Sequence, residues 1–136
     1  MTTARPFLMF QQGRAQAALD LYFETFPDSR MVHVEHWEQG EPGPAGTIKV
    51  ATFTLFGREY LCSDSPMTHD FDFTPSLSIY VDMDSLAELE RAFGILSEGG
   101  EVLMPLDDYG FSQRFGWVSD RFGVSWQLNL PAGDTR

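Results

Sequence analysis

The sequence predicts an α+β fold of two β-α-β-β-β modules within one domain spanning residues 1–136. Two amphipathic helical patterns occur, and each follows one short apolar strand pattern and precedes three more. Glycine and proline separate these elements. The repeat is one of element order, with a period of roughly 65–70 residues. We expect module one at about residues 5–65 and module two at about residues 74–131. The pattern alone also admits a ferredoxin-like duplication.

The first module contains a helix, expected over residues 14–26. Its apolar positions recur every three or four residues and are Ala15, Ala18, Leu19, Tyr22, Phe23 and Phe26. Pro27 ends it. The strands expected around it are residues 7–11, 31–37, 47–56 and 59–63, with a glycine- and proline-rich loop over 38–46.

The second module repeats this order after a loop over residues 64–75. A helix is expected over residues 84–97, with Asp84 as its N-cap and Gly99-Gly100 as its stop. The strands are expected at residues 76–82, 101–106, 112–119 and 124–130. Asp120 to Gly123 separates the last two strands and predicts a hairpin turn, because Asp favours turn starts and Gly adopts positive φ.

Composition restricts the partners of this chain. Its net charge is −11, and twelve of its 20 acidic residues lie between Glu59 and Asp108, where Arg91 is the only Lys or Arg. No basic cluster could displace counterions from nucleic acid, and an anionic membrane surface is disfavoured for the same reason. No apolar run of about 18 residues predicts a transmembrane helix. One cysteine excludes an internal disulfide, and with no signal-peptide pattern at the N-terminus we expect a cytoplasmic protein.

Several segments in order resemble one known family. The most specific is G-W-V-S-D-R-F-G-V-S-W-Q-L at residues 116–128, and the others are residues 17–22, 26–29, 53–57, 73–78 and 96–100. Together they resemble the PhnB-like (demethylubiquinone methyltransferase-like) branch of the glyoxalase/bleomycin-resistance/extradiol dioxygenase, or vicinal oxygen chelate, superfamily. The resemblance covers nearly the whole chain. It implies modules joined edge to edge into a curved, cleft-bearing mixed sheet, and a homodimer.

The resemblance also implies where a metal site would lie. Metal-dependent members of the superfamily place His or Glu on the first, fourth, fifth and eighth strands. The matching positions here are Phe7, residues 61–63, Ser76 and Gln127. Only Cys62 among them is a strong ligand type, so we expect no metal and no cofactor.

We expect a ligand-binding cleft lined by Phe7, Cys62, Ser76, Ser78, Tyr80, Arg114 and Gln127. Arg114 would hold a carboxylate or phosphate if it faces the cleft, whereas Arg121 is expected to pair with Asp120 or a neighbouring acid. Strand alternation predicts that Trp126 is core while Gln127 faces the opposite side.

The remaining reactive residues favour structural or surface roles. Alternation places His33 and His36 on opposite faces of one strand, unless a bulge intervenes, so exposed histidines are expected. His69 is expected as a mobile surface residue in its loop. Cys62 as a nucleophile would need a nearby cation, and only Arg58 is local, so a small buried strand residue is the favoured interpretation.

We expect this protein to bind a small, partly apolar molecule in a metal-free cleft. The alternatives are a metal-dependent lyase, isomerase or dioxygenase, and an assembly partner with an empty cleft. Methyl transfer with a nucleotide cofactor is not expected, because Gly13 is a lone glycine at the first strand–helix junction and residues 81–84 contain none.

Overall fold

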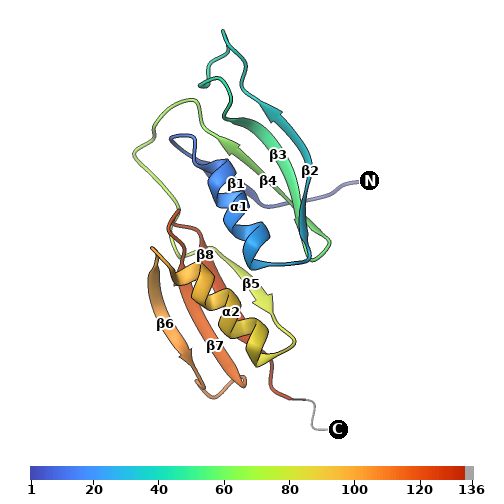
Figure 1. Ribbon diagram of the computed structural model, residues 1–136, viewed down its shortest axis with the longest axis vertical. Coiled ribbons are helices and arrows are strands. Elements are labelled where there is room, and N and C mark those ends of the chain that lie inside the picture. Colours follow the sequence, from blue (N-terminus) through green and yellow to red (C-terminus); the bar gives the residue numbers. More distant parts are fainter. Residues whose placement is uncertain (134–136) are drawn as a thin grey trace. The chain divides into compact units, whose positions relative to one another are not determined.

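The computed structural model describes residues 1–133 and divides the chain into two compact units, Met1–Asp72 and Phe73–Arg136. Each unit contains one helix and four strands in the order β-α-β-β-β (Figure 1). No helix of the described residues is long and apolar enough to cross a membrane.

The first unit places helix α1 against one four-stranded sheet. Its elements are β1 (Phe7–Phe10), α1 (Ala15–Thr25), β2 (Ser29–His36), β3 (Ile48–Leu55) and β4 (Arg58–Asp64). The strand order is β1-β4-β3-β2, in which β1 and β4 are parallel and the other pairs antiparallel. Phe56 and Gly57 join β3 to β4 with φ of +51° and +80°. Two positive φ values are typical of the turn that matches the twist of a two-residue hairpin.

The second unit has the same topology. Its elements are β5 (Ser78–Asp82), α2 (Leu86–Ser97), β6 (Glu101–Asp107), β7 (Arg114–Ser119) and β8 (Ser125–Leu130). The order β5-β8-β7-β6 repeats that of the first sheet, with β5 and β8 parallel. The predicted α+β fold of two β-α-β-β-β modules is therefore confirmed.

Each sheet packs one face against its helix. In the first unit Phe23 of α1 contacts Phe53 of β3 edge to face, with ring centroids 6.2 Å apart. In the second unit α2 covers Gly116 of β7, where an added Cβ would lie 2.5 Å from the ring of Phe93. Only glycine fits there, so the helix can approach the sheet closely. As predicted, Trp126 is fully buried.

Several element boundaries differ from the predictions, among them the starts of α2 and β5. Ser85, not Asp84, caps α2, because its hydroxyl accepts a hydrogen bond from the Glu88 amide at 3.2 Å. This Ser-x-x-Glu spacing is that of a capping box. Strand β5 begins at Ser78 rather than residue 76, since Pro75 and Ser76 form a turn and Leu77 a bend.

The predicted hairpin between β7 and β8 is confirmed and is organised by the buried Asp120. Its Oδ1 accepts from the amides of Phe122 (2.8 Å) and Val124 (3.1 Å). Its Oδ2 accepts from the Trp126 indole at 2.9 Å. The D-R-F-G-V-x-W motif therefore encodes one carboxylate and its three donors.

Asp64 has the corresponding role in the first unit. Its side chain is buried, and its Oδ1 accepts from the Ala15 amide at 2.9 Å while Oδ2 accepts from the Ile48 amide at 2.8 Å. The N-cap residue Arg14 makes no side-chain cap. The Asp64 carboxylate therefore caps α1 from a distant strand and joins the helix to the start of β3.

We predict that Asp64→Asn lowers the free energy of unfolding by about 2–3 kcal/mol, because one amide donor then faces an NH₂ group instead of a carboxylate oxygen. Urea denaturation measures the change. The matched control is Asp28→Asn at an exposed carboxylate, expected within about 0.5 kcal/mol of the parent. Equal effects of the two substitutions would contradict the capping role of Asp64.

Candidate functional site

The two faces of the second sheet have different chemistry. Register pairs Ser78 and Tyr80 of β5 with Ser125 and Gln127 of the central strand β8. It also pairs Trp117 and Phe115 of β7 with Gln127 and Asn129 of β8. Neighbours across strands share a face. We call this the non-helical face of the second sheet, defined by Ser78, Tyr80, Asp82, Phe115, Trp117, Ser125, Gln127 and Asn129.

A row of hydrogen bonds crosses this face. The Gln127 amide Nε2 donates to Ser78 Oγ at 3.1 Å, and Ser78 Oγ lies 2.7 Å from Ser125 Oγ. Trp117 Nε1 donates to Ser125 Oγ at 2.8 Å. The row links three strands and holds its side chains in fixed positions, which suits recognition of a polar group.

Tyr80 extends the row with an aromatic ring. Half of the side chain is exposed, and its ring lies 6.2 Å from that of Phe115. Partial burial, and then the nearby Asp82 carboxylate, raise the pKa of the Tyr80 hydroxyl. The hydroxyl is therefore a neutral donor and acceptor at pH 7. The face thus combines polar and aromatic surface.

Two predicted cleft residues of this unit lie elsewhere. Arg114 pairs with Leu130 and alternates with Phe115, so its position is on the face of Gly116, toward α2. The strand pleat therefore separates Arg114 from Ser78, Tyr80 and Gln127, contrary to the prediction. Ser76 is exposed in the turn before β5, where its hydroxyl lies 2.7 Å from that of Thr74.

In the first unit Phe7 and Cys62 lie on opposite faces. Phe7 pairs with Leu61 and is 53% exposed, whereas Cys62 pairs with Leu8 on the helix side and is fully buried. Burial, reinforced by the Asp64 carboxylate, raises the pKa of the Cys62 thiol to about 12. Cys62 is a core residue, as favoured from the sequence, and cannot share a surface with Phe7.

The donors at the predicted metal positions do not fit a divalent ion. Phe7 has no ligand atom, and the hydroxyl of Ser76 and the amide of Gln127 are neutral and already hydrogen-bonded. Cys62, the one strong ligand type, lies on the helix side of its sheet. The described residues also contain no group of three or more His, Cys, Asp or Glu side chains that could hold an ion.

The histidines have separate environments. His33 and His36 are exposed, as predicted, and His33 Nε2 lies 3.2 Å from Glu35. Strand β2 is irregular between Glu35 and His36, so simple alternation does not fix the faces of the two histidines.

His69 differs from the prediction because its loop is held in place. Its backbone amide donates to the Gln11 side chain at 2.6 Å, and its ring nitrogen Nε2 lies 2.8 Å from Ser65 Oγ. Gln11, buried at the end of β1, also donates to the Phe71 carbonyl at 2.7 Å. A hollow of about 250 Å³ lies here, lined by Gln11, Gln12, Arg14, Thr68, His69, Asp70, Phe71 and Asp72. No sequence pattern marked Gln11, because a single buried amide has no periodic signature.

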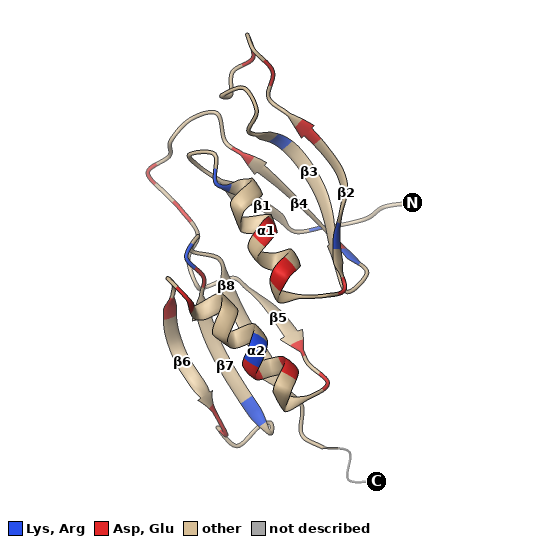
Figure 2. Ribbon diagram, viewed as in Figure 1, with Lys and Arg blue, Asp and Glu red and all other residues tan. Residues whose placement is uncertain are grey.

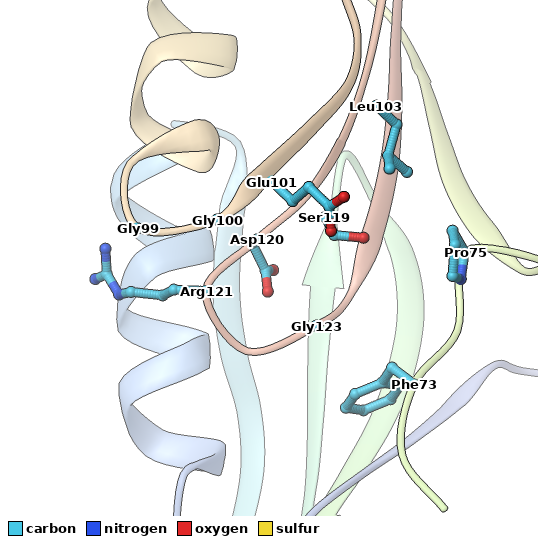
Figure 3. A pocket seen from close by; sticks show the side chains of 10 residues that line it. All are labelled: Phe73, Pro75, Gly99, Gly100, Glu101, Leu103, Ser119, Asp120, Arg121 and Gly123. Atoms are coloured by element: carbon cyan, nitrogen blue, oxygen red, sulfur yellow. The ribbon is translucent and has the colours of Figure 1, made fainter.

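A hollow of about 460 Å³ lies at the end of α2 in the second unit (Figure 3). Phe73, Pro75 and the Asp120 hairpin contribute to its walls. Figure 3 shows the Arg121 side chain extending away from Phe73 and Pro75. Arg121 Cζ lies 5.5 Å from the Phe122 ring centroid. None of the seven predicted cleft residues lines this hollow or the one beside His69.

Comparison with known proteins identifies the family of this chain. A family model described as 3-demethylubiquinone-9 3-methyltransferase matches residues 2–129. The chain belongs to this family. The PhnB protein from Bacillus cereus is 43% identical over 95% of this chain and 99% of its own, with a TM-score of 0.91. Protein PA1353 from Pseudomonas aeruginosa is 29% identical over 98% and 100% of the two chains, with a TM-score of 0.82.

A more distant solved structure shares the fold alone. A glyoxylase/bleomycin resistance protein/dioxygenase domain from Frankia sp. EAN1pec has a TM-score of 0.69 at 13% identity, over all of this chain and 95% of its own. This PhnB-like chain therefore has the glyoxalase-like fold, and the comparisons define no reaction for it.

We predict that Cys62 makes stability fall at alkaline pH. The unfolded thiol ionises near 9, whereas the folded thiol stays protonated until about 12. The folded state then binds more protons, so stability is complete below pH 9 and is lost as pH rises toward 12. Urea denaturation from pH 8 to 10.5 should show a decline in the parent that is shallower in Cys62→Ala by up to about 1.4 kcal/mol per pH unit. Identical slopes would contradict the burial of Cys62.

Proposed function

We propose that the protein binds a small, partly apolar molecule on the non-helical face of the second sheet, without a bound metal. The observation that carries this proposal is the row formed by Gln127, Ser78 and Ser125 beside the half-exposed ring of Tyr80. Phe7 supplies exposed apolar surface in the first unit, apart from this face.

Electrostatics at the helix starts disfavours a methyltransferase that uses a nucleotide cofactor. Phosphates bind helix N-termini through free amides and the helix dipole. The buried carboxylate of Asp64 already occupies the start of α1, and Ser85 caps the start of α2, with Glu88 in its first turn. Gly13 at the first junction has φ of +70°, and an added Cβ would lie 3.1 Å from Thr47. The local turn therefore explains this glycine without a cofactor. We propose that the family description does not give the activity.

We predict that Gln127→Leu abolishes the thermal shift caused by small, partly apolar molecules that bind the parent in a screen, because the row loses its amide. The matched control is Gln16→Leu on the exposed surface of α1 in the other unit, which should retain the shift. Binding unchanged in Gln127→Leu, or lost equally in both variants, would overturn the proposed site.

We propose a homodimer, as the resemblance implies. Strands β2 and β6 each end their sheet, and Val32 and Val102 on these edges are both 45% exposed. Exposed apolar edges favour a covering partner. Light scattering at micromolar concentration should give a mass near twice 15.4 kDa, and a monomer would contradict this.

We propose a cytoplasmic location because the lone cysteine is a buried thiol.

A further inference from the structure

An aromatic cluster lies at one end of the non-helical face. Phe115 is its buried centre, and the rings of Phe111, Tyr109 and Tyr80 lie 5.1, 6.2 and 6.2 Å from it. Phe111 is 57% exposed, Tyr80 50% and Tyr109 38%. We call these four residues the aromatic cluster. Their partly exposed rings are a surface on which an apolar or cationic group can pack.

Two hydrogen-bond acceptors adjoin this cluster. Register places Asn129 between Phe115 on β7 and Asp82 on β5. Asn129 Nδ2 donates to Asp82 Oδ1 at 2.9 Å, which fixes the orientation of the amide. Asn129 Oδ1 then has no hydrogen-bond partner among the described residues, although the residue is only 7% exposed. A buried acceptor without a donor is destabilising, so a ligand that supplies one gains affinity.

The charge of this region is also uncompensated. Asp82 is exposed and forms no ion pair with any residue that the structure describes. Arg114, the basic residue on β7, is positioned on the opposite face of the sheet. Figure 2 shows the basic positions of the second unit on α2, at the start of β7 and in the β7–β8 turn, and an acidic position at the end of β5.

We propose that the aromatic cluster, Asp82 and Asn129 form a binding site for a protonated amine that carries N–H groups on an aromatic or apolar body. The inference rests on the proposed function and names its ligand class. Asp82 supplies a negative charge, the ring faces favour cations, and Asn129 Oδ1 requires a donor. Phe111 is the most exposed ring of the cluster.

The same chemistry discriminates among ligands. A carboxylate of similar shape is repelled by Asp82, and a neutral alcohol lacks the charge attraction. A quaternary ammonium retains the attraction to the rings but has no N–H for Asn129. The site should therefore rank a primary ammonium above the quaternary ion, and both above the alcohol and the carboxylate.

The test uses NMR titration of the full chain at pH 7 with four probes that share a benzyl or phenyl group: benzylammonium, benzyltrimethylammonium, benzyl alcohol and benzoate. Benzylammonium should bind about tenfold tighter than benzyl alcohol, with shifts at Tyr80, Phe111 and Asn129. Benzoate should cause no shifts there.

Two substitutions locate the effect. Asp82→Asn removes the charge and keeps an acceptor for Asn129, and it should remove the tenfold preference. The matched control is Asp84→Asn, the same charge change at an exposed residue outside the cluster, which should keep the preference. Phe111→Ala should weaken benzylammonium binding without changing the melting temperature, since this ring is mostly exposed.

Failure of this inference is distinguishable from failure of the proposed function. Equal binding of benzylammonium and benzyl alcohol, with shifts at Ser78 and Gln127, would overturn the amine site and support the proposed function. Loss of the preference for benzylammonium in both Asp82→Asn and Asp84→Asn would show that the preference comes from the overall negative charge of the protein. That result would overturn the site. No binding of any probe at millimolar concentration, together with no hit in the thermal screen, would overturn both.

Discussion

A buried carboxylate that accepts hydrogen bonds from the backbone is the interaction on which each unit depends. Asp64 binds amides of α1 and β3, and Asp120 binds amides of its own hairpin and the Trp126 indole. Desolvating a carboxylate is costly, but charge-assisted bonds to fixed donors offset that cost. The donors also need the carboxylate, because buried amides without an acceptor are themselves unfavourable. Each aspartate therefore stabilises an arrangement that no apolar residue could satisfy.

These two carboxylates also determine which surfaces can be functional. Asp64 fills the helix start that other folds use for phosphate, and Asp120 fixes the hairpin that sets the register of β7 against β8. With register fixed, alternate residues of β8 have opposite roles. Trp126 and Leu128 are buried, whereas Gln127 is half-buried and hydrogen-bonded on the other face. The second unit thus has an apolar helix side and a polar, aromatic side.

The sequence predicted the features that depend on local order. Helical periodicity, the glycine stops and the Asp120 turn are contained within short windows, so both helices and the hairpin agree with the structure. The cap of α2 was missed because Asp84 and Ser85 are both good caps, and only Ser85 lies three residues before Glu88. The side of Arg114 was missed because alternation gives two faces without saying which one the helix covers. That choice depends on tertiary packing at Gly116.

The acidity of the chain shows how a global property differs from a local one. A net charge of −11 supports solubility wherever the acids lie. Asp82 differs from Asp84, two residues away, only through its surroundings: its carboxylate accepts from Asn129 and lies on the face of Tyr80 and Phe115. Those partners come from strands that are far apart in sequence, so no window of the sequence contains them together. Strand register, rather than charge count, therefore makes one of these carboxylates a candidate for recognition.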